Sequence, residues 1–507
     1  MLHLDELANI ENLLDLGKYD DVKTQISDLK QKIKHKNSEV DLELLFARYL
    51  RETGNAKESE RLTDNLIIKA KELQNSLLLT KTYIENAYDN WYLGFHNKSI
   101  ERGLDALNLS KRDKSKESQV LTAKSNNLIG NVEIERGNST AAINYYTVAL
   151  QIHQEHGNKM GSAYVLNNLG FAYSYLGRLN AALSHYEKSK DLFTSLDNEH
   201  LIAISMGNIG QIYILKGNLE KALELSLKSI SVLERIGNAQ SLAEFSTNIG
   251  QIYHAKGELE KAIKYYKKSL DILLHQDNDV WVSFALFYYI LANADYDLEE
   301  AKIWLEKLRS FLEVEDRDTS LIQLRYNIAA AVLLIKTSRL TNLVKAESLL
   351  KEILNNDTVD DYSITILAIK NLADIRLVEL RLFTDSVNLK ELLDLIAKMT
   401  DLSKLHGSFI TETQSLILYA KLKLIEGEFE VANSSLNEAL IIAKNHGLVT
   451  LANEINEEIK KLYNEVNKYE TMFRDSKIME LQIEVGEVRE YLNKILSSGI
   501  LRGKRQN

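Results

Sequence analysis

Glycine returns at a fixed interval of 40 residues through the centre of the chain, at Gly130, Gly170, Gly210 and Gly250. Three further landmarks keep this interval: a second glycine (Gly137, Gly177, Gly217, Gly257), an alanine (Ala142, Ala182, Ala222, Ala262) and an asparagine (Asn158, Asn198, Asn238, Asn278). Such a period indicates stacked repeats, each too small to bury its apolar face alone. The 507-residue chain has no proline and hence no proline-rich linker, so we expect one continuous superstructure.

The landmarks of one repeat predict two antiparallel helices, A and B. Gly170 lies inside an apolar stretch of helical periodicity, where the missing Cβ lets the second helix approach closely. Gly177 is expected to end helix A in a left-handed conformation. Ala182 and Tyr186 are four residues apart on one face of helix B, which places a small residue at the helix crossing and a large one beside it. Asn198 belongs to the turn before the next helix.

This pattern resembles the tetratricopeptide repeat (TPR) family, which combines an apolar residue, glycine, aromatic, glycine, alanine and aromatic. Two repeats meet it in full: Leu169, Gly170, Tyr173, Gly177, Ala182 and Tyr186, and then Ile249, Gly250, Tyr253, Gly257, Ala262 and Tyr266. The repeat between them departs at its last position, where Ser226 replaces the aromatic residue. The long period and the missing closing proline are similar to the subgroup seen in kinesin light chains, Pins-type polarity adaptors, peptide-sensing bacterial regulators and long archaeal regulatory proteins.

The resemblance implies an all-α fold: a right-handed superhelical solenoid of about eleven antiparallel helix hairpins, whose concave inner surface is lined by the A helices. Fainter copies of the pattern extend in both directions and divide the chain into predicted segments. These are degenerate hairpins at 1–117, four regular repeats at 118–277, degenerate hairpins at 278–450, a helical cap or coiled-coil segment at 451–497, and a basic tail at 498–507.

The register of the resemblance also predicts which residues face the concave groove and contact a bound peptide. They are Asn127, Asn131, Tyr164, Asn167, Asn168, Phe171, Tyr175, Asn208, Gln211, Asn248, Gln251 and His254. Asn168, Asn208 and Asn248 recur at one position per repeat, and a side-chain amide can both donate to and accept from a peptide backbone. We expect these amides to be exposed and free of protein partners. The alternative is that they stabilise the packing of the A helices.

Composition and motifs exclude several classes of function. A formal net charge of −10 argues against a protein that binds nucleic acid by neutralising phosphates. The lack of cysteine excludes disulfides and thiolate metal sites, and no apolar stretch is long enough to span a membrane. His153 and His156 are three residues apart, but without a third ligand they favour a solvated helix end over a metal site. No phosphate-binding loop, nucleophile elbow or zinc-protease helix occurs.

The C-terminal region carries an apolar stripe with 4-3 spacing instead of the repeat. Its first half is Ile455, Ile459, Leu462, Val466, Tyr469 and Phe473, and its second half is Ile478, Leu481, Val485, Val488, Leu492 and Ile495. We expect the first half to cap the last hairpin. The second half, within residues 478–497, is expected either to wrap onto the array or to pair with a second copy of the chain as a homodimer.

We therefore expect a cytoplasmic interaction scaffold or adaptor that holds a peptide or helix of a partner protein in its groove. The sequence predicts neither enzymatic activity nor a cofactor. A peptide-responsive sensor, similar to the bacterial TPR regulators, is the alternative. Those regulators carry an N-terminal effector such as a helix-turn-helix, whereas residues 1–75 predict further hairpins, which favours the scaffold.

Overall fold

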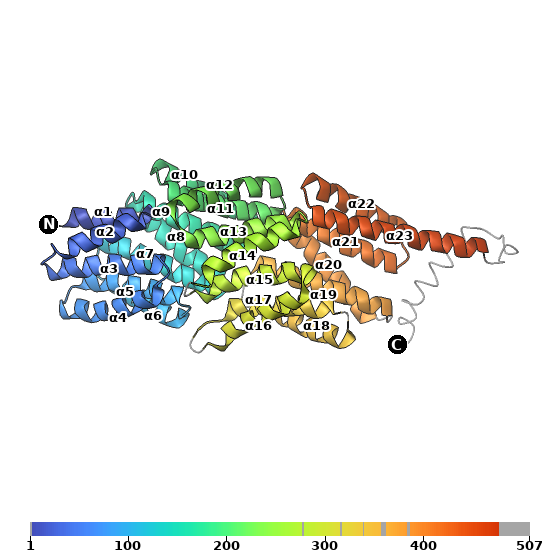
Figure 1. The fold of residues 1–507 in the computed structure, drawn as a ribbon, viewed down its shortest axis with the longest axis horizontal. Helices are drawn as coiled ribbons and strands as arrows, with labels where there is room; N and C mark the ends of the chain where they lie inside the picture. Colours follow the sequence, from blue (N-terminus) through green and yellow to red (C-terminus); the bar gives the residue numbers. More distant parts are fainter. Residues whose placement is uncertain are drawn as a thin grey trace.

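The computed structural model describes residues 3–275, 278–314, 317–337, 339–355, 361–382 and 386–475, with side chains except for residue 386 and residues 465–475. Within these residues the chain forms 23 α-helices and one short 3-10 helix, and no strand. Consecutive helices pack against each other as eleven hairpins, followed by one last helix (Figure 1). The fold is therefore the all-α array of hairpins that the repeat predicts.

The helix bounds follow the repeat along the chain. The first six hairpins are α1 (Leu4–Asp15) and α2 (Tyr19–Lys30), α3 (Lys36–Glu52) and α4 (Ala56–Glu72), α5 (Ser76–Tyr92) and α6 (His96–Ser110), α7 (Lys116–Glu135) and α8 (Ser139–Glu155), α9 (Lys159–Tyr175) and α10 (Leu179–Ser195), and α11 (Glu199–Lys216) and α12 (Leu219–Ile236). The odd-numbered helices are the A helices.

The remaining five hairpins are α13 (Ala239–Ala255) and α14 (Leu259–Leu273), α15 (Asp279–Tyr296) and α16 (Leu298–Ser310), α17 (Ser320–Lys336) and α18 (Leu340–Leu354), α19 (Tyr362–Leu382) and α20 (Ser386–His406), and α21 (Phe409–Ile425) and α22 (Phe429–Asn445). The 3-10 helix η1 (Phe311–Glu313) follows α16, and the single helix α23 (Val449–Asp475) ends the described chain.

The repeat landmarks define the ends of the A helices. The second glycine of each regular repeat adopts the left-handed conformation just after helix A, with φ of 70° at Gly177 and 85° at Gly217, so it ends the helix as predicted. The recurring asparagine begins the next A helix. The side chain of Asn198, for example, accepts a hydrogen bond of 3.0 Å from the backbone N–H of Leu201, which satisfies an N–H group that the helix leaves unpaired.

The first glycine of each repeat makes room for an aromatic ring from helix B. A Cβ on Gly170 would lie 2.8 Å from the ring of Tyr186, which is only 2% exposed. The repeat that lacks the aromatic residue keeps the same contact with a smaller partner, because a Cβ on Gly210 would lie 2.8 Å from the Ser226 hydroxyl. In each regular repeat, a side chain of helix B thus packs directly against the bare backbone of helix A.

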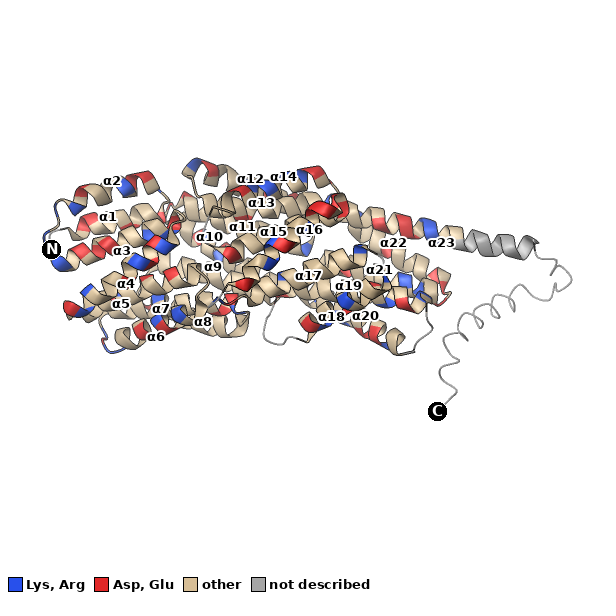
Figure 2. Cartoon of the chain, turned by 60° about the horizontal axis from the view of Figure 1, so that its bottom comes forward, with Lys and Arg blue, Asp and Glu red and all other residues tan. Residues whose placement is uncertain are grey.

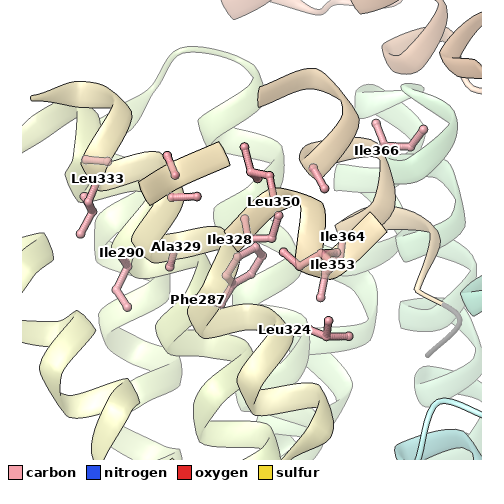
Figure 3. Packing of buried hydrophobic residues seen from close by; sticks show 14 of the residues in the cluster. Phe287, Ile290, Leu324, Ile328, Ala329, Leu333, Leu350, Ile353, Ile364 and Ile366 are labelled. Atoms are coloured by element: carbon pink, nitrogen blue, oxygen red, sulfur yellow. The ribbon is translucent and has the colours of Figure 1, made fainter. Parts of the chain in front are cut away.

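The degenerate hairpins from α15 to α20 also bury a continuous apolar core, although they lack the glycine and tyrosine landmarks. Phe287, Ile328, Leu350 and other apolar side chains of α15, α17, α18 and α19 form the largest continuous core (Figure 3). A buried arginine replaces the repeat landmarks here: Arg376, on α19, bonds to Glu391 of α20 at 2.7 Å and also contacts Glu347 of α18 and Glu379.

Successive turns of the superhelix touch each other along a seam, where the C-terminal end of one A helix meets the start of a later one. Asn198, at the start of α11, donates to the carbonyl oxygen of Asp15 at the end of α1. Ser408, before α21, bonds the carbonyl oxygen of Leu215 on α11 at 2.7 Å. Both contacts join hairpins that are five positions apart, so about five hairpins complete one turn.

A buried ion cluster reinforces this seam. His96 of α6 is 2% exposed and lies 2.9 Å from the Glu135 carboxylate of α7. Its other ring nitrogen faces Asp318, just before α17, at 3.6 Å, and the backbone N–H of Asp318 donates to the carbonyl oxygen of Gly94. Burial alone would lower the pKa of His96, but Asp318 and Glu135 outweigh it and raise the pKa to about 9.

The last described helix, α23, packs along α22, and its C-terminal part extends beyond the last hairpin (Figure 1). Ile455 and Leu462, from the first half of the apolar stripe, are buried in a cluster with residues of α21 and α22. The predicted pairing segment 478–497 and the basic tail 498–507 lie outside the described residues. Acidic and basic residues are interspersed along most helices (Figure 2), and no described helix has the length and apolarity needed to cross a membrane.

The packing predicts that two equivalent glycines differ in their tolerance of alanine. Gly170→Ala should be more destabilising than Gly210→Ala by about 1–3 kcal/mol, because the new Cβ presses on a buried ring in one repeat and on a rotatable hydroxyl in the other. Both variants gain the same helix propensity, so the difference isolates the contact. Urea unfolding of the two variants measures it, and equal stabilities would contradict the assigned contact.

The seam predicts a stability difference that depends on pH. The folded-state pKa of His96, about 9, lies above its unfolded value of 6.5, so its stabilisation of up to about 3 kcal/mol is complete below pH 6.5 and is lost as the pH rises past 9. Thermal unfolding of the wild type and His96→Asn should therefore differ most near pH 6 and converge near pH 10. A difference that stays constant over this range would show that His96 is not charged in the folded protein.

Candidate functional site

A cavity of about 470 Å³ lies on the concave side of the superhelix. Residues of every A helix from α5 to α17 line it, together with the start of α19 and a few B-helix residues. Its walls therefore come from both sides of the seam, and α9 contacts α19 directly. Phe287 and Ile364, which line this cavity, also belong to the large core of the degenerate hairpins (Figure 3).

The structure brings most of the predicted groove residues together in this cavity. Nine of the twelve line it: Asn131, Tyr164, Asn167, Asn168, Phe171, Tyr175, Asn208, Gln211 and Asn248. They come from α7, α9, α11 and α13, which are consecutive A helices. The other three, Asn127, Gln251 and His254, lie on the same helices outside the lining. Whether the twelve contact a ligand stays a prediction.

Aromatic side chains give the cavity its apolar walls. Tyr164 packs edge-on against Phe193, with ring centroids 5.5 Å apart, and Phe171 packs in the same way against Tyr175 at 4.9 Å. Phe171 remains 37% exposed, so much of its ring is open to an incoming group. Large, stiff rings of this kind give high contact area at a low cost in conformational entropy.

The expectation that the asparagine amides are free of protein partners was wrong. The Asn168 amide donates to the side-chain oxygens of Asn127 at 2.9 Å and Asn131 at 3.1 Å. In the next repeat, the Asn208 amide donates to Asn167 at 3.0 Å. Asn168 and Asn208 therefore bridge adjacent A helices, because the close spacing of these helices brings each amide within reach of the preceding repeat. Asn248 is only 1% exposed, and its side-chain oxygen accepts from Gln251 on its own helix. Asn168 and Asn208 are only half-buried, so both still face the groove.

The wall opposite the asparagines comes from the degenerate hairpins, and sequence reasoning missed it. It contains Trp281, Phe284 and Tyr288 of α15, Arg325 of α17 and Asp361 at the start of α19. The signal for Arg325 was a single charge inside the apolar run 321–335. Such a charge in a buried helix must find partners. The charge of Arg325 thus indicates a polar part of the cavity lining, which the repeat pattern does not predict.

The two charged groups of this wall are held in place by the protein. Arg325 donates 2.7 Å hydrogen bonds to the carbonyl oxygen of Val280 and to the hydroxyl of Ser283. Asp361 accepts from the backbone N–H groups of Ser363 and Ile364 at 3.0 and 3.1 Å, which caps α19. Burial raises the pKa of Asp361, while these bonds and the charge of Arg325 oppose the shift.

Another carboxylate that lines the cavity is Glu244 of α13, which the sequence did not single out. It lines the cavity and has no hydrogen-bond or ion-pair partner among the described residues. Burial raises the pKa of its carboxyl to about 7, because a low-dielectric site disfavours the charged form. Its signal in the sequence is an acid in the otherwise uncharged stretch 239–255 of an A helix.

The histidine pair at the end of α8 does not form a metal site in the described part of the chain. The His153 ring is 3% exposed and packs against Gly161, and burial lowers its pKa to about 4. His156 contacts the side chain of Gln119 instead. No group of three potential metal ligands occurs among the described residues, so the pair has a packing role.

Comparisons with known proteins agree with the repeat and the fold. A Rap protein complexed with competence and sporulation factor is 13% identical, with a TM-score of 0.53 over 72% of this chain and 98% of that chain. NprR in complex with its cognate peptide NprX is 16% identical, with a TM-score of 0.48 over 79% of this chain and all of that chain. No curated protein sequence matches the chain.

The Rap structure shows the same fold, a superhelix of stacked helical hairpins. A family model described as the MalT-like TPR region matches residues 125–469, which is more than half of the chain. The match begins inside the first regular repeat and continues through the degenerate hairpins into α23. The chain therefore belongs to the family of MalT-like TPR regions.

Proposed function

We propose that this protein binds a short peptide in the cavity on the concave side of its superhelix. The observation that carries the proposal is the lining: aromatic side chains make the walls, and side-chain amides from consecutive A helices stand among them. Aromatic walls supply contact area, and amides can pair with the main chain of a peptide. A few polar groups on a mostly apolar surface are typical of a specific ligand site.

The size of the cavity argues for a short segment. Its volume of about 470 Å³ falls in the range of about 300–1,000 Å³ that holds small ligands. The seam contacts between successive turns, such as Tyr92 with Trp281 and Ser408 with Leu215, narrow the groove that an open solenoid would offer to a long helix. We therefore propose a few residues of a peptide, free or at a partner's chain end, as the occupant.

A scaffold or adaptor role and a sensor role both rest on such a site. The sensor is favoured by one observation: the lining comes from both sides of the seam, from α5 to α19. A ligand that contacts both sides changes the relative stability of the closed and open seam. We propose binding and not catalysis, with neither cofactor nor metal, and a cytoplasmic location fits the lack of cysteine.

Filling the cavity should abolish peptide binding. Ser241 lines the cavity at the start of α13, so Ser241→Trp places an indole in the ligand's space. Ser195, exposed at the end of α10, gives the control Ser195→Trp. The probe is a mixture of N-acetylated, C-amidated peptides of four to eight residues, incubated with the protein and analysed by mass spectrometry after gel filtration.

The wild type and Ser195→Trp should retain the same peptides, and Ser241→Trp should bind the best of them at least about tenfold more weakly, the equivalent of losing one well-placed contact. Circular dichroism should show all three proteins equally helical. Peptide retention that is unchanged in the filled variant would place the binding site elsewhere, and no retention by the wild type would contradict peptide binding.

A further inference from the structure

Glu244 differs from the other charged groups that line the cavity. Glu135 lies 2.9 Å from His96, Asp361 accepts two backbone N–H groups, and Arg325 donates to Val280 and Ser283. Each of these groups thus has an ion-pair or hydrogen-bond partner within the protein. The Glu244 carboxylate alone lacks a partner within the described part of the chain.

An uncompensated carboxylate in such a site is unfavourable. The half-buried carboxylate of Glu244 loses part of its hydration and gains no protein partner in exchange, and burial accordingly raises its pKa to about 7. Burial raises the pKa of Tyr175 and Tyr186, and the charge of Glu244 adds to both shifts; the two phenol groups line the same cavity as the carboxylate. A glutamine or an apolar residue at this position would avoid the desolvation cost, so the carboxylate destabilises the protein when no ligand is bound.

We propose that Glu244 binds the ammonium or guanidinium group of a basic residue in a short peptide ligand. This inference rests on the proposed function and names the charge that the ligand carries. An ion pair with the ligand would compensate the carboxylate in a site where water is largely replaced by protein, and hydrogen bonds between charged groups are the strongest available there.

The surroundings of Glu244 suit an organic cation better than a metal ion. Divalent cations such as Ca²⁺ take six to eight oxygen ligands, whereas the described residues hold no group of three acidic or imidazole ligands. Aromatic rings line the same cavity, among them Tyr175, and their faces attract ammonium and guanidinium groups. Arg325 donates to Val280 and Ser283 and not to Glu244, so it leaves the carboxylate available.

The test uses four peptide sublibraries that differ in one fixed position. Each consists of N-acetylated, C-amidated tetrapeptides whose second residue is lysine, arginine, glutamine or glutamate, with the other positions randomised. The full chain is compared with Glu244→Gln, which keeps the shape and removes the charge. The control Glu224→Gln makes the same change on the exposed face of α12, where Glu224 pairs with Lys228. Thermal melts confirm that both variants fold.

The wild type and Glu224→Gln should retain the lysine and arginine sublibraries in preference to the other two, and Glu244→Gln should bind the best basic peptide about tenfold more weakly. Retention without any preference for basic peptides, or a preference that survives in Glu244→Gln, would overturn the inference and leave peptide binding intact. Retention of no sublibrary by the wild type would overturn both.

A second readout separates charge recognition from a general loss of packing. The charged and titratable groups that share the cavity with Glu244 are Glu135, Tyr146, Tyr164, Tyr175, Tyr186, Tyr288, Arg325 and Asp361. Burial raises the pKa of Glu244 to about 7, and Glu244→Gln removes this titration while leaving the other groups in place. The wild-type affinity for the basic peptide should therefore rise between about pH 6 and pH 8, as Glu244 loses its proton, and the affinity of Glu244→Gln should stay flat. A parallel rise in both proteins would contradict the assignment.

Discussion

The contacts along the seam, where the end of one A helix meets the start of another five hairpins later, determine the shape of the binding site. A hairpin array is held together by nearest-neighbour packing, and nothing in that packing alone requires successive turns to touch. Here Asn198 donates a hydrogen bond to the carbonyl oxygen of Asp15, and Ser408 donates one to the carbonyl oxygen of Leu215. These bonds convert an open groove into a cavity with two walls, one from the regular repeats and one from the degenerate hairpins.

The two walls of the cavity contribute different kinds of side chain because their sequences differ. In the regular repeats, the same type of residue recurs at the same position of successive A helices. Their wall therefore carries a series of side-chain amides, which also form hydrogen bonds between neighbouring helices, as Asn168 does with Asn127. The degenerate hairpins are free of that constraint. They contribute individual groups, above all Arg325 and Asp361. The charge on Glu244 stands out because it belongs to a regular helix and yet is compensated by neither wall.

Local structure could be predicted from the sequence because it depends on single residues. The turn at Gly177 requires a left-handed residue, and the bare backbone at Gly170 receives the ring of Tyr186. The seam could not be predicted, because it results from small angles between hairpins that accumulate over a whole superhelical turn. The opposing wall was missed for the same reason. No local pattern connects Arg325 to the groove of α9, although an arginine inside an apolar helix was a visible signal.

The central claim is that successive superhelical turns are in contact, and a distance between them tests it most directly. Gly17 packs against Ile236 across the seam, and the neighbouring Lys18 and Arg235 are both exposed. Because the chain has no cysteine, the double variant Lys18→Cys and Arg235→Cys can be labelled with one nitroxide at each new cysteine and nowhere else. Pulsed electron spin resonance should then give one narrow distribution within roughly 25 Å, as expected for labels on helices whose axes are about 8–10 Å apart. A broad distribution centred well beyond that distance would mean that the turns are open and that the cavity does not form.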